Sequence, residues 1–123
     1  MAKSIERYFR LLPAQRRQRL SDRLWSPAAD VYETADGWIV KVDLAGVRLE
    51  EIEIEIKDQD LRIAGIRRDT MCSETIAYHQ LEITYSRFEK TLHFPCAIEG
   101  TSIERDYHDG LLILRLRSSG ECE

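Results

Sequence analysis

The run Trp38-Ile39-Val40-Lys41-Val42-Asp43-Leu44 places Trp38, Val40, Val42 and Leu44 on one face of an extended chain, and Ile39, Lys41 and Asp43 on the other. A period of two is typical of a β-strand with one buried face. The same period recurs in residues 52–56, 61–65, 88–94 and 112–117. The chain therefore carries repeated strand signals from residue 29 onward.

Short turn sequences separate these runs. Asp36-Gly37 and Asp109-Gly110 favour tight hairpins, because both central residues of such turns need positive φ. Asp58-Gln59-Asp60 is a third turn signal, and nothing after residue 25 indicates a helix of ten or more residues. We predict an all-β fold, an immunoglobulin-like antiparallel β-sandwich of two packed sheets, over residues 26–117.

Length and composition set the broad class. The chain has 123 residues, of which 43% are apolar and 33% charged, so one domain with a charge-dense surface is expected. The longest uninterrupted apolar run is Leu111 to Leu114, far short of the about 20 residues of a membrane-spanning helix. The first residues lack the apolar stretch of a signal peptide, so a cytoplasmic location without an integral membrane segment is expected.

The first 25 residues differ from the rest of the chain. They hold seven basic and two acidic residues, a net charge of +5, while the remaining residues sum to −9. Helical spacing before Pro13, and again after it, predicts a short amphipathic N-terminal arm, residues 1–25. Three roles stay open: packing on the body or a sister chain, binding other proteins, or contacting an anionic membrane or nucleic acid. Of these roles, we assign the binding of other proteins to the apolar side chains of this arm: Ile5, Tyr8, Phe9, Leu11, Leu12, Leu20 and Leu24.

Catalytic and metal-binding patterns are weak. Glu51, Glu53 and Glu55 share one strand face, whereas glycosidase carboxylates flank a cleft from separate elements. The three histidines lack metal-ligand spacing, and the sequence contains neither a glycine-rich phosphate loop nor a Gly-x-Ser-x-Gly motif. A pI of about 5.4 argues against a nucleic-acid-binding domain. We expect no enzyme activity, no cofactor, no metal and no nucleic-acid partner.

The cysteines favour free thiols. Cys72, Cys96 and Cys122 are odd in number and far apart, unlike the paired cysteines of a secreted scaffold or a zinc site. The alternative is a regulatory disulfide between chains, formed by Cys72 or Cys122.

Five stretches together resemble the alpha-crystallin domain of the small heat-shock proteins. Residues 25–34 resemble the first strand of that domain, and Val42-Asp43-Leu44-Ala45-Gly46-Val47 is similar to its DLPGV turn. The other three are Leu61 to Arg67 (LxIxGxR), Phe88 to Pro95 (FxRxFxLP) and Asp109 to Leu114 (NGVLxI). The five stretches occur over residues 25–117 in the family's order and spacing, and this ordered set is highly specific for the family. The chain departs from the family pattern at Ala45, Ile83, Ser86 and Arg105.

The resemblance implies a function. Small heat-shock proteins are ATP-independent holdase chaperones of the stress response, which bind partly unfolded proteins and prevent their aggregation. The alternative is an adaptor resembling the CS-domain co-chaperones, which share the sandwich and bind a dedicated partner chaperone.

The resemblance also implies a homodimer formed by strand exchange. Residues 68–84 form a long connection, and in the bacterial-type family this connection carries a strand that pairs with a sister chain's sheet edge. Such pairing would cover an edge that otherwise invites uncontrolled association. The residues expected in this dimer strand are Thr75, Ile76, Ala77, Tyr78, His79, Gln80 and Leu81.

The end of the chain lacks a family feature. Residues 118–123 contain no Ile-x-Ile motif, which in the family plugs a neighbour's groove between the domain's fourth strand and the strand that here follows Gly100. We therefore expect an open or arm-covered groove, and dimers or small arm-linked oligomers rather than a tail-locked cage. The residues expected to line or border the groove are Ile52, Ile54, Ile56, Ile103, Tyr107, Leu111 and Ile113.

Overall fold

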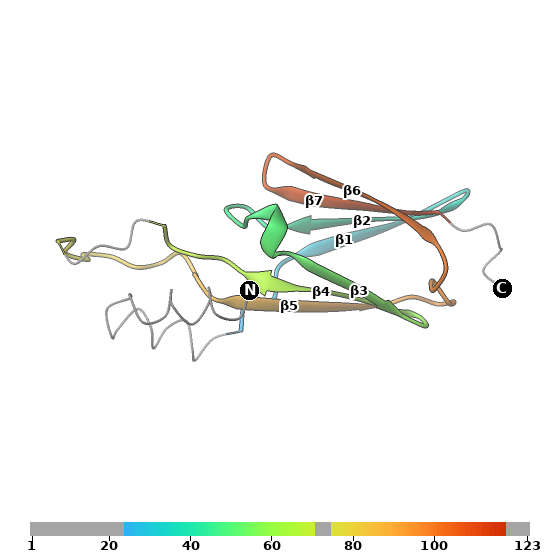
Figure 1. The fold of residues 1–123 in the computed structure, drawn as a ribbon, viewed down its shortest axis with the longest axis horizontal. Helices are drawn as coiled ribbons and strands as arrows, with labels where there is room; N and C mark the ends of the chain where they lie inside the picture. The colour runs from blue at the N-terminus through green and yellow to red at the C-terminus, as the bar shows by residue number, and fades with distance from the viewer. Residues whose placement is uncertain (1–23, 71–74, 118–123) are drawn as a thin grey trace.

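The computed structural model describes residues 24–70 and 75–117, which contain seven strands and one 3-10 turn, η1 (Leu49–Glu51). Two sheets face each other, as Figure 1 shows. The strands are β1 (Ala29–Thr34), β2 (Gly37–Asp43), β3 (Glu53–Lys57), β4 (Asp60–Ile66), β5 (Arg87–His93), β6 (Ser102–His108) and β7 (Leu111–Arg117).

Every strand pair is antiparallel. One sheet has the order β1-β2-β7-β6 and the other the order β3-β4-β5. The turns predicted from Asp36-Gly37, Asp58-Gln59 and Asp109-Gly110 join β1 to β2, β3 to β4 and β6 to β7. Asp58 and Asp109 adopt φ of 53° and Gly110 adopts 80°, the left-handed conformation that such tight turns require.

The core lies between the two sheets and follows the period of two. Leu112, Leu114 and Leu116 of β7 are fully buried between the sheets, while Arg115 and Arg117 are exposed. Trp38 closes one end of the core by packing edge-to-face on Phe94, with ring centroids 5.2 Å apart. The buried cluster comprises Val40, Val42, Leu44, Val47, Ile52, Leu61, Ile63, Phe88, Phe94, Ile98, Leu112, Leu114 and Leu116.

The sandwich has two long sides, and each is bordered by a different pair of edge strands. Trp25 forms an isolated bridge with Phe88 of β5, and β1 begins four residues later at Ala29. The edge strands β1 and β5 therefore lie on the same side of the sandwich. The other two edge strands, β3 and β6, consequently border the opposite side.

The predicted all-β sandwich is confirmed. Most of the predicted arm, residues 1–23, and the tail, residues 118–123, lie outside the described residues. The expectation of three free thiols is wrong for Cys96, which is disulfide-bonded. Its partner lies outside the described residues, because Cys96 is the only cysteine within them. The wide sequence spacing of the cysteines gave no indication of this bond.

Gly65 sets how closely β4 approaches its neighbours. A Cβ at this position would lie 2.4 Å from the Glu51 carbonyl oxygen and 2.7 Å from the Phe88 ring. The first of these atoms belongs to the backbone, so the side chain could not be accommodated by a rotamer change alone. Any larger residue at this position would have to push β4 away from Phe88 and η1.

Gly65→Ala is expected to destabilise the domain by about 2–3 kcal/mol, since the added methyl overpacks a rigid site. Chemical denaturation followed by tryptophan fluorescence measures this loss. Gly100→Ala is the matched control: a methyl group added there would meet no heavy atom within 4 Å, and φ of 88° leaves only a backbone cost of about 1–2 kcal/mol. Equal stability of Gly65→Ala and the parent would contradict the packing argument.

Candidate functional site

Half-buried apolar side chains line the side of the sandwich between β3 and β6, where the sequence predicts a groove. Ile54 and Ile56 of β3 face Ile103 and Tyr107 of β6, and all four are half-buried and packed against the core. Ile52, just before β3, is buried at the same side. Five of the seven groove residues predicted from the sequence thus come together here. Within the described residues, β3 and β6 each have one edge without a strand partner beside these apolar side chains.

One end of the groove is fixed by hydrogen bonds. The Tyr107 hydroxyl donates to the Leu44 carbonyl over 2.6 Å, which holds the ring against the turn that follows β2. The Val47 N–H donates back to the same carbonyl, and the Leu44 N–H donates to the Gly110 carbonyl. The turn resembling DLPGV therefore closes this end of the groove.

The other two predicted groove residues lie on a different face. Leu111 is paired with His108 and Ile113 with Asp106, so both side chains lie on the outer face of the β1-β2-β7-β6 sheet. Leu112, between them, is fully buried in the core. Because neighbouring residues of a strand point to opposite faces, Leu111 and Ile113 cannot share the groove face with Tyr107.

A charged residue interrupts the groove. Arg105 alternates with Ile103 and Tyr107 on β6 and pairs with Leu114, so it lies on the groove face of the strand, yet it is exposed. The groove can therefore accept apolar side chains at two positions along β6, separated by a guanidinium that favours a carboxylate or a carbonyl oxygen.

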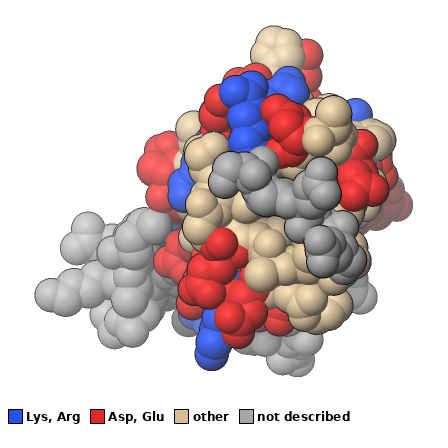
Figure 2. Space-filling view, turned by 90° about the vertical axis from the view of Figure 1, so that its right-hand side faces the viewer, with Lys and Arg blue, Asp and Glu red and all other residues tan. Residues whose placement is uncertain are grey.

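The surface around the end of the groove is charged. Arg117 forms an exposed ion pair with Glu104 across β6 and β7, at 3.4 Å. Figure 2, a view of the end that holds the β3–β4 turn, shows Lys, Arg, Asp and Glu gathered above and below a band of uncharged residues.

The predicted dimer segment extends away from the sandwich. Residues 75–86 contain no strand in the single chain, and Figure 1 shows this connection reaching beyond the ends of both sheets. Ile76 and Ile83 are exposed on it, and Val31 and Tyr32 are exposed on the edge strand β1. The predicted strand over Thr75–Leu81 is therefore absent without a second chain, and its exchange with a partner stays a prediction.

Arg67 joins three segments that the sequence reasoning did not connect. Its guanidinium donates two hydrogen bonds to the Thr84 carbonyl, at 2.8 and 2.6 Å, and one to the Ala45 carbonyl at 3.2 Å. It also lies 3.8 Å from the centre of the Trp25 ring, a cation–π contact. Arg67 ends the stretch resembling LxIxGxR, and this was the only sequence signal for its role.

Two arginines of this strand region differ in environment. Burial lowers the pKa of the Arg67 guanidinium, although Tyr85 and Asp43 partly oppose this effect. The hydrogen bond to Glu89 and the charge of Glu89 raise the pKa of Arg62, which lies half-buried on the outer face of β4. Arg67 is a structural cation held by carbonyl oxygens, whereas Arg62 belongs to a surface ion-pair network.

The remaining predicted site residues lie mostly outside the described residues. Ile5, Tyr8, Phe9, Leu11, Leu12 and Leu20 of the arm fall within residues 1–23, while Leu24 is described and exposed. Among residues 24–70 and 75–117, no group of three or more His, Cys, Asp or Glu side chains could hold a metal ion. No helix in these ranges is long and apolar enough to cross a membrane.

Comparison with known sequences identifies relatives. A sequence model described as the Hsp20/alpha crystallin family matches residues 30–121. Spore protein SP21 of Stigmatella aurantiaca is 27% identical over 97 residues, covering 79% of this chain and 57% of the relative. The 23.2 kDa heat shock protein of rice is 34% identical over 93 residues, covering 72% of this chain and 43% of the relative. The chain thus spans about half of the length of these curated relatives.

Solved structures share the fold. Heat shock protein 16.0 from Schizosaccharomyces pombe has a TM-score of 0.71 at 28% identity, covering 77% of this chain and 88% of the other. The hspA protein from Xanthomonas axonopodis has a TM-score of 0.65 at 23% identity, covering 79% of this chain and 97% of the other. The second likeness supports the sandwich alone.

Arg67→Met is expected to destabilise the domain by about 2–4 kcal/mol, because it leaves the Thr84 and Ala45 carbonyls without their donor and removes the contact with Trp25. Urea denaturation measures the loss, and the emission of Trp25 should change in the folded state. Arg62→Met is the matched control on the same strand, with a clearly smaller expected cost because its ion pairs are exposed to water. Equal losses of unfolding free energy in the two variants would show that Arg67 does not hold these three segments together.

Proposed function

Because the chain belongs to the Hsp20/alpha-crystallin family, we propose that it is an ATP-independent holdase chaperone, which binds partly unfolded proteins and prevents their aggregation. The observation that carries this proposal is the groove between β3 and β6, where half-buried apolar side chains lie beside two unpaired strand edges. An unfolded chain can supply extended backbone that pairs with these strand edges, and apolar side chains at alternating positions that pack into the groove.

The groove suits weak and reversible binding. Each apolar side chain that a client buries against Ile54, Ile56, Ile103 or Tyr107 would contribute about 1.5–3 kcal/mol before the cost of ordering the client. Two such contacts give a modest affinity, which allows release without nucleotide hydrolysis. Native proteins keep these side chains buried, so the groove would select unfolded clients.

We assign a second set of client contacts to the arm. Tyr8, Phe9, Leu11 and Leu12 form its most apolar stretch, and all four lie outside the described residues. The cytoplasmic location expected from the sequence also stays a prediction, which cell fractionation tests.

The proposed dimer pairs residues 75–81 of one chain with β1 of its partner. The exposed Val31 and Tyr32 on the β1 edge and the exposed Ile76 on the connection support this pairing, since both surfaces would gain from being covered. The Lys41 ammonium group lies over the Tyr32 ring, 5.5 Å from the ring centre. The exposed edge of β1 therefore carries an aromatic ring in contact with a cation.

Holdase activity is expected to depend on the groove. The full chain should suppress heat-induced aggregation of an unrelated enzyme without ATP, measured by light scattering. Ile56→Lys should reduce this protection several-fold by placing a charge among the apolar contacts. Leu49→Lys, at an exposed position of η1 outside the groove, should protect as well as the parent. No protection by the parent chain would contradict the proposal, and so would equal protection by the two variants if both are folded by circular dichroism.

The dimer is expected to depend on the connection. Deleting Met71 to Leu81 should give monomers, because it removes the only segment expected to cover the β1 edge of the partner. Light scattering coupled to gel filtration gives the mass. A shortened chain that still has the mass of a dimer would contradict strand exchange.

A further inference from the structure

A second hollow lies on the outer face of the β3-β4-β5 sheet, away from the groove. It has a volume of about 200 Å³, comparable to one or two large apolar side chains. Glu53, Ala64 and Glu89 are paired across the three strands and line it together. Ala64 and Ile66 are only 7% and 1% exposed, yet neither belongs to the core cluster between the sheets. The outer face therefore has an apolar floor of its own.

The rim of this hollow is charged, and it holds both signs: Glu51, Glu53, Glu89, Arg62, Arg68 and Arg87 line it. Glu51 is paired with Arg68 at 2.8 Å, and Glu89 with Arg62 at 3.0 Å. Glu53 is exposed on the same rim, and its charge acts on Arg62, a residue already paired with Glu55 and Glu89. The exposed carboxylate of Glu53 could accept a further cation that flanks an apolar side chain in the hollow.

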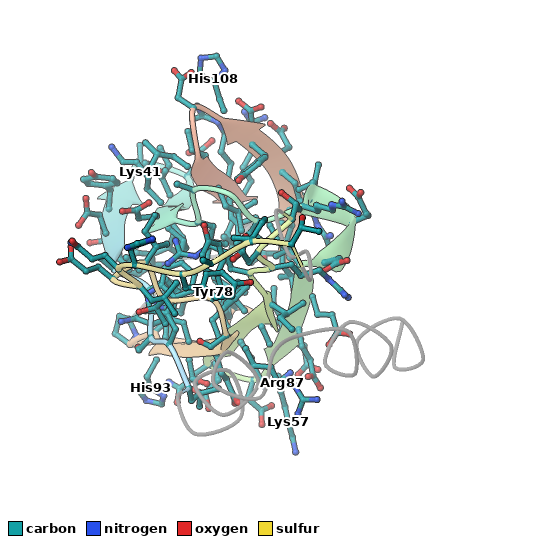
Figure 3. All side chains as sticks on the ribbon, turned by 90° about the vertical axis from the view of Figure 1, so that its left-hand side faces the viewer. Lys41, Lys57, Tyr78, Arg87, His93 and His108 are labelled. Atoms are coloured by element: carbon teal, nitrogen blue, oxygen red, sulfur yellow. The ribbon has the colours of Figure 1, made fainter. Side chains whose placement is uncertain are left out.

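The arm joins the sandwich beside this hollow. The Trp25 N–H donates to the Arg87 carbonyl at 2.9 Å, and the Glu89 N–H donates to the Trp25 carbonyl at 3.3 Å. Arg87 and Glu89 both line the hollow, and Figure 3 shows Arg87 on the outer side of the sheet. Residues 1–23 therefore end two positions before a residue that is hydrogen-bonded to the hollow's own strand.

The sequence of the arm near this point complements the hollow. Leu20 has Arg16 four positions before it and Arg23 three positions after it, so the three share one face of a helix. Residues 1–23 carry a net charge of +5 against a net charge of −9 for residues 26–123. Leu20 lies only four residues from Leu24, which is about 6 Å along a helix.

We propose that the arm docks back on its own chain, with Leu20 seated in the hollow of the β3-β4-β5 sheet and Arg16 and Arg23 facing the carboxylates of its rim. Docking would cover apolar surface of the arm when no client is present. It would also leave the groove between β3 and β6 open, because the two sites lie on different faces of the sandwich. The inference that the arm docks in this hollow does not depend on the proposed function.

Photo-cross-linking of the full chain tests the docking. Benzoylphenylalanine replaces Leu20, and in the matched control it replaces Gln18, which points to the opposite face of the helix. We expect Leu20 cross-links within one chain, mapped by mass spectrometry to peptides that contain Ala64 to Arg68 or Arg87 to Glu89, and several-fold fewer from position 18. Cross-links to β6, cross-links between two chains or equal yields from both positions would overturn the proposal.

A charge reversal tests the complementarity independently. Glu53→Lys should raise the rate of tryptic cleavage at Arg16, Arg19 and Arg23 about two- to five-fold, the effect expected for losing one exposed charge pair. Glu55→Lys is the matched control: it lies on the same face of β3 and changes the net charge equally, but it does not line the hollow. Equal cleavage in the two variants would contradict docking. Neither readout measures aggregation, so failure here leaves the holdase proposal standing.

Discussion

A single guanidinium holds the irregular parts of this sandwich together. Arg67 donates to carbonyls of the turn after β2 and of the connection before β5, and its flat face covers Trp25. These three segments have no strand pairing with one another, so the hydrogen-bond ladders of the two sheets cannot align them. Arginine suits the position, since its planar fork can serve several carbonyls while it stacks on an indole. The partly buried charge is tolerated because those oxygens replace water around it.

The position of Trp25 makes the two sides of the sandwich unequal. Its bridge to Phe88 adds backbone hydrogen bonds at the β5 edge, and its ring packs edge-to-face on Phe88 at 5.6 Å. No comparable bridge covers β3 or β6 within the described residues. Strand edges invite pairing with other chains. The open side is therefore the one suited to transient partners, while the Trp25 side sets where the arm joins the domain.

The period of two predicted the strands because burial on one face leaves a local trace in the sequence, as in residues 38–44 and 112–117. Five apolar side chains that the resemblance and the same alternation assign to the groove lie on the β3–β6 side, and their role stays a prediction. Leu111 and Ile113 were placed beside the groove, although strand geometry puts them on the outer face. The links through Arg67 and the hollow lined by Ala64 could not be predicted. They depend on contacts between distant segments, and alternation carries no information about those contacts.

On the proposed function, the groove must attract extended chains without joining the protein to copies of itself. Its apolar side chains serve the first need, and the charges on its edges serve the second. Arg105 lies on the groove face of β6, and Glu53, Glu55 and Lys57 alternate along β3 with the isoleucines. Charged residues on an edge strand, especially those that point inward, oppose continuous pairing because a second strand would have to desolvate them. Arg105 is a departure from the family pattern, and on the proposed function its charge opposes pairing with a rigid sheet edge, whereas a flexible client could bend around it.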